Sequence, residues 1–104
     1  MTRALLHFVK CDFGKGGVAF IERDIADMDL ETTVADIASG QIDNVLAVYE
    51  TCEEGPIFRD VTEDIAKAVM AVWADEDQPL QDWQHSFVEL FVSVTAANSF
   101  RRAA

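Results

Sequence analysis

The chain has 104 residues, half of them apolar, and it carries a formal net charge of −11. It is the size of one domain and long enough to bury roughly 65% of the surface that its unfolded form exposes, so we expect a packed core rather than intrinsic disorder. Direct binding to nucleic acid or to an anionic membrane is disfavoured, because phosphate contacts need clustered Lys and Arg.

The N-terminal part predicts a β-hairpin followed by a short helix. Residues 3–9 are rich in β formers, residues 18–25 alternate between two faces, and a glycine-rich turn joins the two segments. A helix is expected over 28–40, where Asp29 is the N-cap and Gly40 is the glycine that ends the helix.

The next segments predict a central strand, an edge strand and the most apolar helix of the chain. Residues 44–51 start apolar on both faces, as a central strand does, and residues 57–59 are a candidate edge strand. Over 60–73 the apolar residues recur at helical spacing. Asp60 and Glu63 form a capping-box pattern at its start, and a Lys one turn after Glu63 makes a favourable ion pair.

A last helix is expected over about 80–95. Asp77 is its expected cap and Pro79 belongs to its first turn. Residues 97–104 are a candidate for a frayed tail.

The order of elements is therefore ββαβ(β)αα, which predicts an α+β fold. We expect a single domain over 1–104, with a small three- to four-stranded, mainly antiparallel sheet and the helices packed on one face. The chain contains no internal repeat and no low-complexity stretch.

Few residues suggest chemistry. The two cysteines, Cys11 and Cys52, lie far apart without metal or redox spacing, so we expect reduced, buried thiols and leave a single disulfide open. His7 alternates with apolar residues on a strand, and His85 lies on the polar face of the last helix, paired with Glu89 at the surface. The glycine loop lacks the Ser or Thr and the helix of a phosphate loop. We expect no catalytic residue, no cofactor and no metal.

The apolar run at 4–9 is too short for a secretory signal or a membrane span, which favours a cytoplasmic protein. The sequence favours a small, acidic, non-enzymatic protein that binds another macromolecule, although solubility alone also explains the charge. A sharper version is an inhibitor that imitates nucleic acid and blocks a basic partner, as anti-CRISPR and other anti-defence proteins do. The candidate acidic interaction surface is Glu53, Glu54, Asp60, Glu63, Asp64, Asp75, Glu76 and Asp77.

Two alternatives stay open. One is a small ligand-binding protein or enzyme with a pocket between sheet and helices, for which the available polar groups are Tyr49, His7, Arg23, Arg59 and Cys52. The other is a homo-oligomeric structural or assembly subunit, because the last helix has a wide apolar stripe. The homodimer seam predicted on that stripe is Trp83, Phe87, Val88, Phe91 and Val92.

Residues 59–66 (RDVTEDIA), which follow residues 37–41 (IASGQ), resemble a pattern in small uncharacterised proteins of alphaproteobacteria. The resemblance covers residues 37–69 and includes no catalytic motif and no assigned activity. It implies a bacterial origin, with a mobile element as one source.

Overall fold

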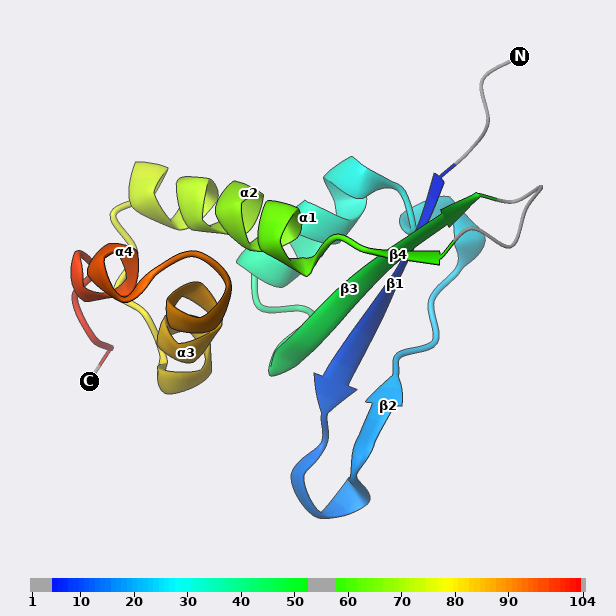
Figure 1. Cartoon of the computed structure of the whole chain (residues 1–104), viewed down its shortest axis with the longest axis horizontal. Helices are drawn as coiled ribbons and strands as arrows, with labels where there is room; N and C mark the ends of the chain where they lie inside the picture. Colours follow the sequence, from blue (N-terminus) through cyan, green and yellow to red (C-terminus); the bar gives the residue numbers. More distant parts are fainter. Residues whose placement is uncertain (1–4, 53–57, 104) are drawn as a thin grey trace.

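The computed structural model describes residues 5–52 and 58–103, except for the side chain of Cys52, and shows one sheet with the helices on one of its faces (Figure 1). The strand order is β2-β1-β3-β4, and every pair is antiparallel. The predicted α+β class is confirmed. In chain order the elements are β1 (Leu5–Asp12), the 3₁₀ helix η1 (Gly14–Gly16), β2 (Val18–Phe20), the 3₁₀ helix η2 (Ile25–Asp27), α1 (Leu30–Ala38), β3 (Val45–Cys52), β4 (Phe58–Asp60), α2 (Thr62–Asp75), α3 (Asp82–Phe91) and α4 (Val94–Asn98).

The central strands β1 and β3 pair along their whole length, from Leu5 opposite Cys52 to Cys11 opposite Val45. A bulge beside Cys11 leaves Leu46 without a partner residue on β1. Along β1 the side chains alternate, so that His7 and Cys11 are buried beneath the helices while their neighbours point to the other face. The predicted central position of residues 44–51 is confirmed.

The predicted hairpin is also confirmed, but its second strand is shorter than expected. Strand β2 ends at Phe20, whereas the alternation predicted a strand over 18–25. After Ile21 the chain leaves the sheet, because the guanidinium of Arg23 donates to the carbonyl of His7 and to the hydroxyl of Thr33. These contacts tie the segment after β2 to both β1 and α1.

Local signals fix both ends of α1. The carboxylate of Asp29 accepts a hydrogen bond from the backbone N–H of Thr32 at 3.1 Å, as an N-cap does. Gly40 has a φ of +85°, the left-handed conformation that ends a helix. Both predictions are confirmed.

Helix α2 begins two residues later than expected and without the predicted capping box. Asp60 accepts from the N–H of Thr62 at 2.9 Å, while Glu63 instead forms the predicted ion pair with Lys67 at 3.0 Å. Trp73, on the buried face of this helix, donates from its indole nitrogen to the carbonyl of Ala38 at 2.9 Å and so joins α2 to α1.

The segment predicted as one last helix is two helices, α3 and α4. Ser93 separates them because its hydroxyl caps α4, accepting from the N–H of Ala96 at 3.0 Å. Helix α3 is capped by Gln81, which exchanges hydrogen bonds with Gln84, and not by Asp77.

Residues 97–103 are held against the body of the protein, in contrast to the frayed tail considered from the sequence. Ala97 is buried, and Leu80 donates to the carbonyl of Arg101 and accepts from the N–H of Ala103, each at 2.8 Å. Among the described residues no helix is both long and apolar enough to cross a bilayer.

Candidate functional site

The predicted acidic set lies mainly at the two ends of α2. Asp60, Glu63 and Asp64 are exposed at its N-terminal end, and Asp75, Glu76 and Asp77 are exposed at its C-terminal end. Thirteen residues separate Glu63 from Glu76, which is about 20 Å along a helix. Glu53 and Glu54 lie outside the described residues.

The second acidic group lies where the helix dipole disfavours it. The sequence placed Asp77 at the start of a helix, but Asp77 follows the end of α2 with a left-handed φ of +51°. Its N–H donates to Ala74 and that of Gln78 donates to Trp73, the two bonds of a Schellman ending. The last turn of α2 contains no basic residue. Asp77 suits this left-handed position, and its carboxylate lies 3.5 Å from Arg101. Asp75 and Glu76, in contrast, each destabilise the negative end of the helix by about 0.3–1 kcal/mol, so capping does not explain these two.

A groove of ≈ 730 Å³ runs between α1 and α2. Its apolar lining combines half-buried Val34 and Val72 with small residues that leave it hollow, Ala35 and Ala68 among them. Leu30, at the first turn of α1, is 53% exposed beside it. The full lining is Leu30, Glu31, Val34, Ala35, Ala38, Ser39, Asp64, Ile65, Ala68, Val72, Glu76 and Gln78.

The charged members of this lining are Glu31, Asp64 and Glu76, and no Lys or Arg is among them. Two of the three belong to the predicted acidic set, one from each end of α2. Glu31 was missed because it lies on α1, and only the packing of α1 against α2 brings it near the others. The structure therefore brings three carboxylates to the rim of an apolar groove.

The predicted dimer seam on α3 is not a single exposed surface. Phe87 and Val88 are buried in the core, so these two residues cannot meet a partner subunit. Trp83, Phe91 and Val92 are half-buried and pack against the same core. Phe87 and Val88 are wrong as seam residues because α3 turns the centre of its stripe towards β3 and α2, whereas the roles of Trp83, Phe91 and Val92 stay predictions. The residue that α3 exposes most is Leu90, at 74%.

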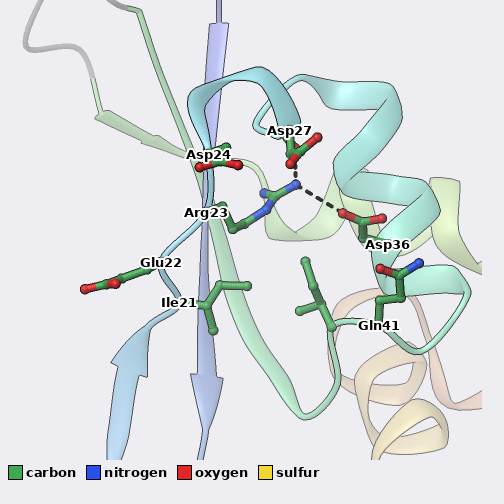
Figure 2. A pocket seen from close by; sticks show the side chains of 8 residues that line it. Ile21, Glu22, Arg23, Asp24, Asp27, Asp36 and Gln41 are labelled. Atoms are coloured by element: carbon green, nitrogen blue, oxygen red, sulfur yellow. Dashed lines mark hydrogen bonds and ion pairs between the residues drawn. The ribbon is translucent and has the colours of Figure 1, made fainter.

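A second hollow, of ≈ 610 Å³, surrounds Arg23 and is strongly polar. Figure 2 shows the Arg23 side chain lying between Asp27 and Asp36. The guanidinium donates to the carbonyls of His7 and Asp27 and to the Thr33 hydroxyl, and it lies 3.6 Å from the Asp36 carboxylate. Four oxygens already engage Arg23, which identifies it as a cross-link between β1, η2 and α1.

His7, Glu50 and Arg59 form a chain of contacts on the covered side of the sheet. The imidazole is 1% exposed, with Nδ1 3.0 Å from the Met28 carbonyl and Nε2 3.2 Å from the Glu50 carboxylate. Arg59 donates to the other Glu50 oxygen at 2.7 Å. Since a carbonyl only accepts, Nδ1 is the donor to Met28. Tyr49 lies on the opposite face of the sheet, so it does not converge with His7, Arg23 and Arg59, and the side chain of Cys52 lies outside the described residues.

His85 is buried, although the sequence placed it on a polar helix face. Arg102 donates to its Nδ1 at 3.2 Å and Asn98 faces its Nε2 at 3.1 Å, while Glu89 lies 3.7 Å away. The C-terminal segment covers this side of α3, which helical periodicity does not predict. Within the described part of the chain, no group of three His, Cys, Asp or Glu residues is arranged to hold a metal.

Cys11 is a free, buried thiol, and burial followed by the nearby Asp43 carboxylate raises its pKa to about 11. Cys11 pairs with Val45, and Cys52 lies at the opposite end of β3. Seven residues of strand separate the two positions by about 23 Å, whereas a disulfide needs Cα atoms within about 7 Å. The disulfide left open by the sequence is therefore excluded within this fold.

Comparison of the chain with protein-family models, with curated proteins and with solved structures found no match. The resemblance over residues 37–69 stays a prediction. The fold and its surfaces define an acidic α+β domain with an acid-rimmed groove between two helices, and its function is inferred from that geometry.

Proposed function

We propose that this protein is a non-enzymatic binding protein whose groove between α1 and α2 takes a basic, amphipathic helical segment of a partner protein. The observation that supports this function is the combination of an apolar lining with three rim carboxylates and no basic lining residue. An amphipathic helix buries its apolar face in such a groove, and its flanking Lys or Arg side chains meet the rim.

The size of the groove suits a short helix. Asp64 and Glu76 lie twelve residues apart on α2, which corresponds to about 18 Å and to about three turns of a bound helix. Burial of apolar side chains supplies most of the affinity, since exposed ion pairs contribute only about 0.2–1 kcal/mol each. The rim charges chiefly select basic partners and speed their association.

Imitation of a nucleic acid is the less favoured form of this proposal. A DNA duplex carries one negative charge per about 1.7 Å of its axis, so a close mimic needs a nearly continuous row of carboxylates. Here an apolar lining separates Asp64 from Glu76. We also propose a cytoplasmic location, with which the free thiol of Cys11 is consistent.

The proposal is tested with a labelled amphipathic peptide of about 14 residues, with Leu at i, i+3, i+4 and i+7 spacing and Lys elsewhere. Fluorescence anisotropy measures its binding to the wild type, to Ala68→Trp and to Ala71→Trp. Both alanines are exposed on α2, but only Ala68 lines the groove. We expect Ala68→Trp to fill the hollow and weaken binding at least about tenfold, whereas Ala71→Trp binds like the wild type.

A second peptide, with Glu in place of every Lys, controls for apolar adhesion and should not bind. Equal affinities of the two tryptophan variants would show that the peptide adheres to the acidic surface at large, and the groove would lose its role. The same conclusion follows if the wild type does not bind the Lys peptide.

A further inference from the structure

Helices α1 and α2 run in the same direction along the groove. The indole of Trp73, near the end of α2, donates to the carbonyl of Ala38, the last residue of α1, at 2.9 Å. Leu30 and Asp64 lie in the first turns of α1 and α2, and both line the groove. Both helices therefore begin at one end of the groove and finish at the other. We call these the N-terminal end (Leu30, Glu31 and Asp64) and the C-terminal end (Ser39, Glu76 and Gln78).

The helix dipoles are compensated at only one of these ends. A helix has a positive pole at its N-terminus and a negative pole at its C-terminus. At the N-terminal end of the groove carboxylates oppose the positive poles, because Asp29 caps α1 and because Glu31 and Asp64 lie in the first turns. At the C-terminal end neither helix has a basic residue in its last turn. The two negative poles are therefore left without a cation of their own helices.

Carboxylates add to the negative potential at the C-terminal end. Glu76 directly follows α2 and lines the groove, and Asp75 precedes it, and both are exposed. The ion pairs of the described residues include neither of them. Arg101 pairs with the next carboxylate, that of Asp77, at 3.5 Å. One cation thus faces three adjacent carboxylates and two negative poles, so this end attracts positive charge more strongly than the other.

We propose that the partner helix lies in the groove antiparallel to α1 and α2, with its N-terminus at the C-terminal end of the groove. The direction of the bound helix rests on the proposed function and adds to it the orientation in which a partner is recognised. In this orientation the positive pole of the bound helix faces Glu76 and the two negative poles. A parallel helix would place three negative poles and Glu76 together.

The N-terminal end of the groove discriminates less between the two orientations, because its carboxylates and positive poles oppose each other. The preference therefore comes mainly from the C-terminal end. A single charge near a helix terminus changes an equilibrium about two- to fivefold. We expect the antiparallel orientation to exceed the parallel one by at least this factor.

Nitroxide labels on the Lys peptide test the direction. One version carries the nitroxide at its N-terminus and the other at its C-terminus, and each is added to the ¹⁵N-labelled protein. We expect the N-terminal nitroxide to broaden the amide signals of the C-terminal end of the groove. The C-terminal nitroxide should broaden those of the N-terminal end. The same peptides with reduced nitroxides give the reference spectra.

A matched pair of variants tests the cause of the preference. Glu76→Lys supplies the basic residue that the C-terminal end lacks, whereas Glu22→Lys makes the same change in charge outside the groove. Both glutamates are exposed. We expect Glu22→Lys to keep the wild-type pattern of broadening. In Glu76→Lys each nitroxide should broaden both ends, because the two orientations become similarly populated.

Reversed broadening in the wild type, or equal broadening of both ends by each nitroxide, would overturn the antiparallel orientation and leave the groove as the binding site. An unchanged preference in Glu76→Lys would also overturn it, because the negative poles and Glu76 would then not set the direction. Broadening at neither end, with binding still seen by anisotropy, would place the peptide outside the groove. That result would contradict the proposed function itself.

Discussion

The groove and the sheet face opposite the helices both expose apolar side chains, but their charged surroundings differ. The sheet face carries an aromatic ring from every strand: Phe8, Phe20, Tyr49 and Phe58. Three carboxylates and no basic residue line the groove, whereas Lys10, Asp12 and Asp60 lie at positions on the sheet face that carries the rings. Apolar burial favours association at any such surface, and the nearby charges select what associates. The comparison suggests that the rim carboxylates direct a basic partner to the groove, whereas the mixed charges of the sheet face are less selective.

The largest expected effect concerns the scaffold that both surfaces share. Burial raises the Cys11 pKa from 9.0 to about 11, so the folded state retains the thiol proton that the unfolded state releases. The resulting stabilisation is complete below pH 9 and is lost as the pH rises to about 11, by roughly 2–3 kcal/mol.

Urea unfolding at pH 8 and pH 11 measures this loss, and Cys11→Ala provides the reference because it lacks the titrating thiol. We expect the free energy of unfolding to fall more in the wild type than in Cys11→Ala. Equal losses in both proteins would mean that Cys11 titrates normally and is not closed off between the sheet and the helices.

An increase in ionic strength should change the affinity of the groove for the Lys peptide and for the Glu peptide in different directions. Raising the ionic strength from about 0.01 M to about 1 M shortens the Debye length from about 30 Å to about 3 Å. We expect binding of the Lys peptide in the groove to weaken about tenfold, since the rim ion pairs are exposed. The Glu peptide should stay unbound or bind slightly better, because the rim carboxylates repel it less. Anisotropy at both salt concentrations measures the two responses, and a parallel response would contradict the comparison, because the rim charges would then not select the partner.

Local signals predicted much of the fold but little of either surface. Asp29 and Gly40 act through their own turn, so the sequence alone placed both ends of α1. Asp77 was misassigned because aspartate suits both a helix N-cap and a left-handed residue after a helix, and only the contacts with Trp73 and Ala74 distinguish the two.

The two surfaces depend on contacts between distant segments. Ala68 leaves a hollow only because α1 packs beside α2, about thirty residues away in sequence. The rings of Phe8 and Phe58 meet only through the pairing of β1 with β3 and of β3 with β4. The apolar periodicity of this segment predicted one continuous helix and so missed the break at Ser93. Serine is a common N-cap residue, and Ser93 does cap α4.

The smallest expected effect separates binding from stability within one helical turn. Asp75 and Glu76 are adjacent at the negative end of α2, but only Glu76 lines the groove. Neutralising either one in Asp75→Asn or Glu76→Gln should stabilise the helix by about 0.3–1 kcal/mol. For a domain of this size that corresponds to a rise in Tm of about 1–5 °C.

The two variants should differ in peptide affinity. Glu76→Gln removes a rim charge and should weaken binding of the Lys peptide about two- to fivefold, while Asp75→Asn leaves it nearly unchanged. Thermal unfolding and anisotropy on the same preparations measure both quantities. Functional sites often contain residues that lower the stability of the fold. A carboxylate that destabilises its own helix and yet strengthens binding fits that pattern. If Glu76→Gln is more stable and binds as well as the wild type, the rim charge at this end has no role in recognition.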